Sequence, residues 1–220
     1  MTLLKAPVID ARGADLSDER LDTPALIVDL DILAANISQM ADFARRSGMR
    51  LRPHVKTHKS VRIARMQLDA GAAGISVAKV GEAEVMRAGG IDDIFIVYPV
   101  VGAAKLDRLA PLVANGGVRL ATDSLEVADG YSRLASRLSR RIPVVIEIDA
   151  GMHRVGVDPA GASALGVDVN RLPGLDVVGL TVYAGHTHDV QTQPEIEAIA
   201  RDEVRAIAIA REGFEAAGLP

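Results

Sequence analysis

Residues 51–60, read LRPHVKTHKS, concentrate cationic side chains within a few positions. Lys56 lies between His54 and His58, each two positions away. Neighbouring positive charges disfavour the charged form of an amine, and a neutral amine is a nucleophile toward carbonyl groups. The spacing therefore predicts that Lys56 forms a Schiff base with a carbonyl ligand. The alternative interpretation is a solvated basic turn.

Residues 147–157, read EIDAGMHRVGV, present a second candidate for ligand binding. The segment turns at Gly151 and places Arg154 shortly before Gly156. A guanidinium group is rigid and suited to an anionic oxygen. We therefore expect Arg154 to bind an anionic part of the ligand, and the alternative is a loop arginine held by a nearby carboxylate.

Residues 180–189, read LTVYAGHTHD, place Gly185 and His186 directly after a strand that ends at Tyr183. Glycine at a strand end lets backbone N–H groups approach an anion, and histidine adds a donor. This pattern favours anion binding. A second interpretation makes histidines the ligands of a metal, as in barrel hydrolases: His54, His58, His186 and His188.

Composition limits the classes of protein to which the chain can belong. The chain has 220 residues, a formal net charge of −4 at pH 7 and no cysteine. This length fits one domain with a full core, and the charge balance argues against nucleic acid as a partner. The lack of cysteine excludes disulfides and thiolate sites. No long apolar run opens the chain, so we expect no signal peptide, no membrane span and a cytoplasmic protein.

Apolar periodicity predicts seven units in which a strand is followed by a helix. The strands are expected at residues 25–28, 51–53, 75–78, 94–98, 118–121, 144–148 and 177–183. The helices are expected after Asp29 or Asp31, through Ala64 and Leu68, at 81–87, at 103–114, after a capping box of Asp123 and Glu126, at 160–169 and at 194–217. Such alternation indicates a parallel sheet with helical crossovers.

Two parallel architectures fit this alternation, an open doubly wound sheet and a (β/α)8 TIM barrel. The first usually has a glycine-rich turn after its first strand, and the turn after Val28 has no glycine. The barrel instead places polar residues at the carboxyl ends of its strands, where this chain has Ser76, Tyr98 and Asp149. We therefore predict an α/β fold of the barrel type. A complete barrel needs about 250 residues, so we expect one that lacks its eighth strand.

Four segments closely resemble the D-threonine aldolase and D-serine dehydratase family: TPALIVDLDILAANI, RPHVKTHKS, VAKVGEAEV and EIDAGMHRVGV. Members of this family are pyridoxal phosphate enzymes with an alanine racemase-like barrel. The resemblance implies a cofactor-binding barrel domain over residues 23–220, after a lead-in segment over residues 1–22. It also implies a homodimer. The C-terminal β-domain of the family pattern is not present in this sequence.

The resemblance also implies roles for single residues. Lys56 is the catalytic residue and carries the cofactor as a Schiff base, and Arg154 lies beside the cofactor ring. The other cofactor-binding residues that it indicates are His54, Ser76, Tyr183, Gly185 and His186. A divalent metal, manganese or zinc, is implied as well, with ligands on the β-domain rather than in this sequence. We therefore expect the chain by itself to be a poor catalyst.

The implied activity is a lyase reaction on small β-hydroxy D-amino acids, of the D-threonine aldolase type, which yields glycine and an aldehyde. The alternatives are a D-serine dehydratase, an amino-acid racemase and a non-catalytic pyridoxal phosphate homeostasis protein. Ala78 and Tyr98 stand where the aldolase branch usually has glutamine and asparagine. Tyr98 with Pro99 is more similar to the dehydratase branch.

Overall fold

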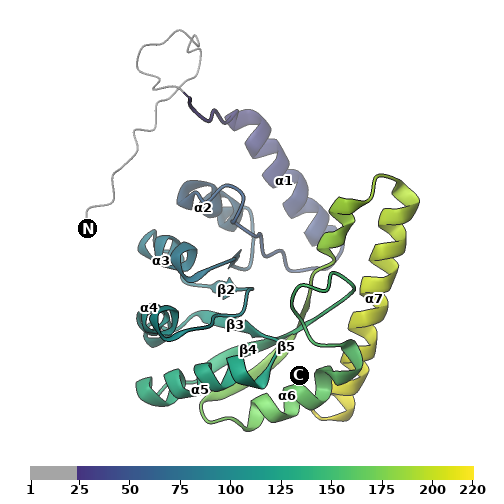
Figure 1. Cartoon of the computed structure of the whole chain (residues 1–220). Coiled ribbons are helices and arrows are strands. Elements are labelled where there is room, and N and C mark those ends of the chain that lie inside the picture. The colour runs from purple at the N-terminus through teal and green to yellow at the C-terminus, as the bar shows by residue number, and fades with distance from the viewer. Residues whose placement is uncertain (1–23) are drawn as a thin grey trace.

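The computed structural model describes residues 24–220 and arranges them around one parallel sheet of five strands (Figure 1). The strands are β1 (Ile75–Val77), β2 (Ile94–Ile96), β3 (Val118–Thr122), β4 (Ile142–Ile148) and β5 (Leu175–Val182). Their order across the sheet is their order in the chain. A doubly wound sheet reverses its strand order at one point, so the consecutive order supports the barrel-type fold.

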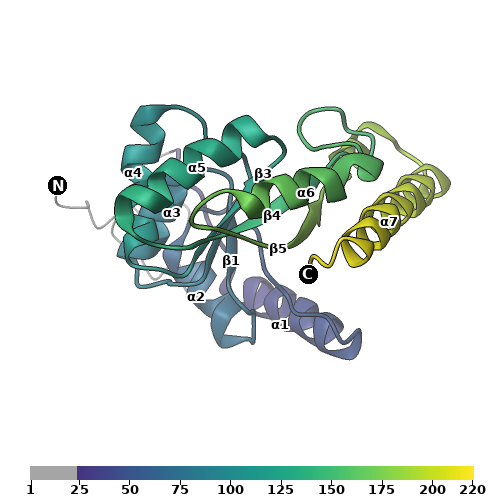
Figure 2. The ribbon, with the colours of Figure 1, turned by 90° about the horizontal axis from the view of Figure 1, so that it is seen from below.

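Seven α-helices in the described part of the chain accompany the sheet. They are α1 (Leu30–Arg46), α2 (Val61–Asp69), α3 (Val80–Ala88), α4 (Ala103–Ala114), α5 (Leu125–Leu138), α6 (Ala162–Arg171) and α7 (Gln193–Ala216). Four of them, α3 to α6, connect successive strands on the outer side of the sheet (Figures 1 and 2). The carboxylate of Asp29 accepts the N–H groups of Asp31 and Ile32 at 2.9 and 3.0 Å. Asp29, rather than Asp31, therefore begins α1.

The predicted capping box at the start of α5 is wrong. Ser124 caps this helix, because its hydroxyl accepts the N–H of Val127 at 3.4 Å. Asp123 lies one residue too early to cap, and its carboxylate accepts the N–H of Gly156 at 3.2 Å instead. Asp123 thus connects the end of β3 to the loop that follows β4.

Two of the seven predicted strands are not strands in the described chain. Residues 25–28 belong to no sheet, and Leu26 is fully exposed. Residues 51–53 run beside β1, where Ser76 donates its N–H to the carbonyl of Pro53 at 2.8 Å and forms one parallel bridge with His54. Pro53 has no N–H to donate, which limits this pairing to a few bonds.

The two faces of the sheet carry different side chains. On β4, Val144 belongs to the large core beneath the helices, whereas Val145 joins Phe95 and Ala121 in a smaller cluster. Successive side chains of a strand point to opposite faces, so Glu147 lies on the same inner face as Val145. In a barrel, this inner face surrounds the axis, and its carboxyl end forms the mouth.

No helix within residues 24–220 combines the length and the apolar character needed to cross a membrane. The expected lead-in segment, residues 1–22, lies outside the described residues.

Candidate active site

Lys56 lies in a turn beside β1, at the edge of the sheet. Val55 donates its N–H to the carbonyl of Ser76 at 2.9 Å, and Lys59 donates its N–H to the carbonyl of Val55 at 2.8 Å. These bonds hold the backbone of the turn against β1, while the side chain of Lys56 is exposed. The amine can therefore meet a ligand without any change in the backbone.

Both histidines that flank Lys56 accept backbone hydrogen bonds. Nδ1 of His54 accepts the N–H of Lys56 at 3.2 Å, and Nδ1 of His58 accepts the N–H of Ser60 at 3.1 Å. Burial lowers the pKa of both imidazoles, and the charge of Lys56 lowers the pKa of His54 further. Neutral imidazoles therefore flank Lys56 at neutral pH, in place of the positive charges expected from the spacing.

Lys59 is anchored to α3 by an ion pair. Its Nζ lies 3.2 Å from Oε1 of Glu82, a side chain that is only 7% exposed. Oε2 of Glu82 accepts the N–H of Ala78 at 2.8 Å. Burial raises the pKa of Glu82, but the Ala78 N–H and Lys59 together lower it by more, so the carboxylate is ionised at neutral pH. The ion pair fixes the end of the Lys56 turn.

The ring of Tyr183 brings Lys56 and Arg154 together. Nζ of Lys56 lies 5.2 Å from the centre of this ring. The guanidinium carbon of Arg154 lies 5.5 Å from the same centre and 5.5 Å from the centre of the Tyr98 ring. Cations at such distances from aromatic rings are attracted to them. Tyr98, Arg154 and Tyr183 follow the carboxyl ends of β2, β4 and β5, so the site lies where a barrel has its mouth.

Asp149 shapes the loop that presents Arg154. Its Oδ1 accepts the N–H groups of Gly151 and His153 at 2.9 and 3.0 Å, and its Oδ2 lies 2.8 Å from Nδ1 of His153. Burial raises the pKa of Asp149, but the N–H groups of His153 and Gly151 lower it by more. The ionised carboxylate thus holds the turn from which Arg154 projects.

Gly185 and His186 lie in a short 3-10 helix, η2 (Gly185–Asp189), that follows β5. A Cβ atom on Gly151 would lie 3.6 Å from Nε2 of His186, and one on Gly185 would lie 2.8 Å from the sulfur of Met152. This helix is therefore packed closely against the Arg154 loop. Nδ1 of His186 is buried without a hydrogen-bond partner in the described structure, so the hydrogen-bonding capacity of this atom is unused there.

Ser76 is nearly buried on β1, beside His54. It belongs to the wall next to the Lys56 turn rather than to the contacts around Tyr183. The metal-hydrolase interpretation finds no support here, because residues 24–220 contain no group of three or more histidine, aspartate or glutamate side chains placed to hold a metal ion. His188 instead lies with its Nε2 3.5 Å from the hydroxyl of Tyr183.

Glu147 is a residue of this site that the sequence analysis did not single out. It is 5% exposed on the inner face of β4, and its Oε2 has no hydrogen-bond partner in the described structure. Burial raises the pKa of Glu147 to about 7, although the positive charge of Arg154 lowers it, and Asp123 and Asp149 raise it. The available signal was an acidic residue inside the apolar strand IPVVIEI.

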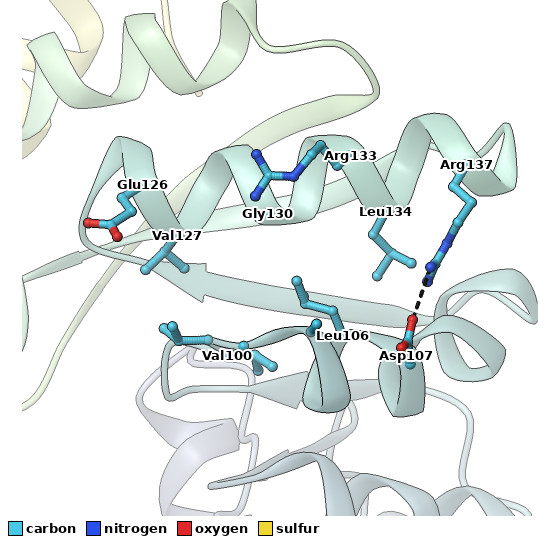
Figure 3. Close-up of a pocket in the computed structure, with 12 residues that line it drawn as sticks. Val100, Leu106, Asp107, Glu126, Val127, Gly130, Arg133, Leu134 and Arg137 are labelled. Atoms are coloured by element: carbon cyan, nitrogen blue, oxygen red, sulfur yellow. Dashed lines mark hydrogen bonds and ion pairs between the residues drawn. The ribbon is translucent and has the colours of Figure 1, made fainter.

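A separate cavity of about 530 Å³ lies between α4 and α5 (Figure 3). Val100, Leu106, Val127 and Leu134 line it, and an ion pair of Asp107 and Arg137 at 2.9 Å lies at one end. Its lining includes none of the residues around Tyr183. We therefore place the candidate active site at the exposed mouth around Tyr183 and not in this cavity.

Residues 28–220 match the model of the alanine racemase N-terminal domain. The D-threonine aldolase of Arthrobacter sp. is 37% identical over 190 residues, which are 86% of this chain and 50% of that protein. The D-threo-3-hydroxyaspartate dehydratase of Delftia sp. (strain HT23) is 37% identical over 205 residues, which are 91% of this chain and 53% of that protein.

A crystal structure of the D-threonine aldolase from Filomicrobium marinum superposes with a TM-score of 0.87 at 37% identity, over 90% of this chain and 54% of that one. The chain thus spans about half the length of the relatives that it matches. The superposition shows that the five-stranded sheet and its helices form an alanine racemase-like α/β fold, as the resemblance implied.

Proposed function

The chain belongs to the family of the alanine racemase N-terminal domain, and from this premise we propose that it binds pyridoxal phosphate through Lys56 and acts as a lyase on D-amino acids. The observation that carries the proposal is the meeting of Lys56 and Arg154 at the ring of Tyr183. One group can attack an aldehyde, and the other can bind an anionic oxygen next to it.

The residues around Tyr183 suit this cofactor. The exposed amine of Lys56 is available to an aldehyde, and the flanking His54 is neutral. The guanidinium of Arg154 offers several donors in a plane. The unpartnered Nδ1 of His186 supplies one more polar contact. Charge, aromatic surface and a free imidazole nitrogen are therefore present for a ligand that is both aromatic and anionic.

Pyridoxal phosphate, when bound, supplies an electron sink for a bond broken at Cα of an amino acid. The protein holds the reacting groups in place. Lys56 can take up or release a proton at Nζ, directly beside the ligand. Arg154, whose guanidinium carbon lies 5.5 Å from the centres of the Tyr98 and Tyr183 rings, can orient an anionic oxygen.

We propose the D-threonine aldolase type of reaction on β-hydroxy D-amino acids, in which the Cα–Cβ bond breaks. The second candidate is elimination of the β-hydroxyl, as in a D-serine dehydratase. Tyr98 favours this second candidate. It is similar to the dehydratase branch in sequence, and its ring centre lies 5.5 Å from the guanidinium carbon of Arg154. The aldolase and the dehydratase among the relatives are equally similar to this chain, so they support the shared chemistry of both.

The resemblance places the ligands of manganese or zinc on the β-domain rather than in this sequence. Within residues 24–220, no cluster of three or more suitable side chains could hold such an ion. No step of the proposal therefore uses a metal.

Reductive trapping tests the role of Lys56. The protein is incubated with pyridoxal phosphate, reduced with borohydride and digested, and its peptides are mapped by mass spectrometry. We expect the pyridoxyl label on Lys56, because its amine is exposed beside Tyr183, whereas Lys59 is paired with Glu82. A label on Lys59 or Lys79 in the unaltered protein would contradict the proposal. Lys56→Ala should lose the label, and Lys105→Ala, an exposed lysine on α4, should keep it.

Product analysis tests the reaction type. Formation of glycine and acetaldehyde from D-threonine supports the aldolase, and formation of pyruvate and ammonia from D-serine supports the dehydratase. Turnover is expected to be low, because the chain by itself is predicted to be a poor catalyst. Racemisation of the substrate without either product set, with Lys56 labelled, would leave cofactor binding in place and refute the lyase assignment.

We also propose that the protein forms a homodimer, because α1 exposes the apolar side chains of Ile32, Met40 and Phe43, which suit burial against a second copy.

A further inference from the structure

Glu147 lies in the top layer of side chains on the inner face of the sheet. The register pairs Val145 with Ala121 on β3 and with Gly179 on β5. Two residues closer to the carboxyl end of β4, on the same face, Glu147 pairs with Thr181. Asp123 directly follows the end of β3, and its charge acts on the Glu147 carboxyl group. The Glu147 carboxyl group therefore faces the floor of the mouth, below the loop that carries Arg154.

The surroundings of this carboxyl group leave its charge uncompensated. The charged groups that act on it are Arg154, Asp123 and Asp149, one positive and two negative. Its Oε2 makes no hydrogen bond within the described structure, although Glu147 is only 5% exposed. A buried carboxylate without full compensation is costly, so small changes in the nearby charge shift its proton equilibrium.

We infer that Glu147 is a positioning residue whose charge state sets how strongly Arg154 binds an anionic oxygen of the ligand. The loop that carries Arg154 returns to β4 at this residue, where Val157 donates its N–H to the carbonyl of Glu147 at 2.9 Å. When Glu147 is ionised, its negative charge offsets part of the positive charge of Arg154 and repels the anionic ligand. When it is protonated, the full charge of Arg154 acts on the ligand. The inference rests on the proposed function, because the ligand is pyridoxal phosphate.

The direction of the pH effect follows from linkage. An anion beside Arg154 adds negative charge near Glu147 and raises the pKa of the carboxyl group above its already raised value of about 7. Binding therefore takes up a proton at Glu147 between these two pKa values. Affinity for the ligand should fall as the pH rises above 7, because ionised Glu147 must then be protonated for the ligand to bind fully.

The test compares the pH dependence of pyridoxal phosphate binding in the unaltered protein and in Glu147→Gln, measured from pH 6 to pH 9 by absorbance titration. The ionisations of free pyridoxal phosphate are common to both proteins, so the difference between the two profiles isolates Glu147. We expect the ratio of the two dissociation constants to change by about tenfold across this range, as for a shift of one pKa unit. Glu126→Gln, an exposed carboxylate on α5, should follow the unaltered profile.

A calorimetric measurement serves if Glu147→Gln does not fold. The unaltered protein is titrated with pyridoxal phosphate at pH 8 in buffers of different ionisation enthalpy, which counts the protons taken up. Uptake in excess of that expected from the cofactor and Lys56 supports the inference, and no excess overturns it.

The two proposals fail in different ways. Parallel pH profiles for the unaltered protein and Glu147→Gln, with the borohydride label still on Lys56, overturn the inference alone. Absence of the label and of binding overturns the proposed function and the inference with it.

Discussion

The buried carboxyl group of Glu147 makes the stability of the protein depend on pH. Its pKa is raised from 4.5 to about 7 in the folded state, so the folded protein holds this proton more tightly than the unfolded chain does. The resulting contribution to stability is complete below about pH 4.5 and is lost as the pH rises through 7. The difference in pKa corresponds to at most about 3–4 kcal/mol.

Glu147→Gln is therefore expected to be more stable than the unaltered protein at pH 8, because glutamine is neutral at every pH. The gain should shrink toward pH 5, where Glu147 is protonated in the folded state. Urea unfolding followed by circular dichroism at both pH values measures the change in the free energy of unfolding. Glu126→Gln should show no such dependence, and an equal effect of Glu147→Gln at both pH values would contradict the expectation.

The loop between β4 and α6 depends on a glycine at its closing position. Gly156 has a φ of +106° and a Cβ atom there would lie 2.5 Å from the backbone nitrogen of Asp149. Gly71 has a similar φ of +103°, but a Cβ atom there would meet nothing within 4 Å. These two glycines therefore separate the cost of the backbone conformation from the cost of a collision.

We expect Gly71→Ala to lower the free energy of unfolding by about 1–2 kcal/mol through its positive φ alone. Gly156→Ala should cost about 2 kcal/mol more, because the backbone of the Arg154 loop must move away from β4. Pyridoxal phosphate affinity should fall for Gly156→Ala and stay unchanged for Gly71→Ala. Urea unfolding and absorbance titration measure the two effects, and equal losses of stability would show that the loop accommodates the added methyl group.

Local signals predicted the helices well. The α4 range was predicted from its apolar spacing, and α7 from Pro194 at its start, because helix formation depends on neighbours a few residues away. Strands depend on distant partners, and the sequence does not show which partner is present. Residues 25–28 are as apolar as a strand, yet they have no sheet partner within the described chain.

Part of the candidate active site was also predicted from the sequence. Lys56, Arg154 and Tyr183 were identified from motifs and lie together as expected, although their roles stay predictions. The spacing suggested a positive charge on His54, but burial lowers the pKa of its imidazole, and the spacing of residues does not show which of them are buried. Glu147 was missed because an acidic residue in a strand gains its meaning only from the face on which it lies and from the charges across the sheet.

At the scale of the whole molecule, α1 stands apart from the main core and packs against α2. Ile32 and Phe43 are 60% and 52% exposed, and a separation of eleven residues places them on the same side of a helix. Met40, 49% exposed, lies near them on the same side, and exposed apolar side chains grouped in this way suit an interface with a second copy.

We expect the double substitution of Ile32→Lys with Phe43→Lys to shift the protein from dimer to monomer, because two charges cannot be buried unpaired in an interface. Size-exclusion chromatography with light scattering measures the mass. Val204→Lys is the control, since Val204 is 66% exposed on α7. An unchanged mass for the double variant would place the interface elsewhere.

The consecutive order of the strands has a consequence for synthesis on the ribosome. Each strand of the sheet pairs with the strand made just before it, so its partner is already in place when it emerges. A strand-and-helix unit of about 25 residues takes roughly 1–5 s to translate. At any moment during elongation the newest strand presents the growing edge, and a nascent chain is most open to misassociation at that edge. A pause in translation at any point before the next strand emerges would therefore prolong that exposure.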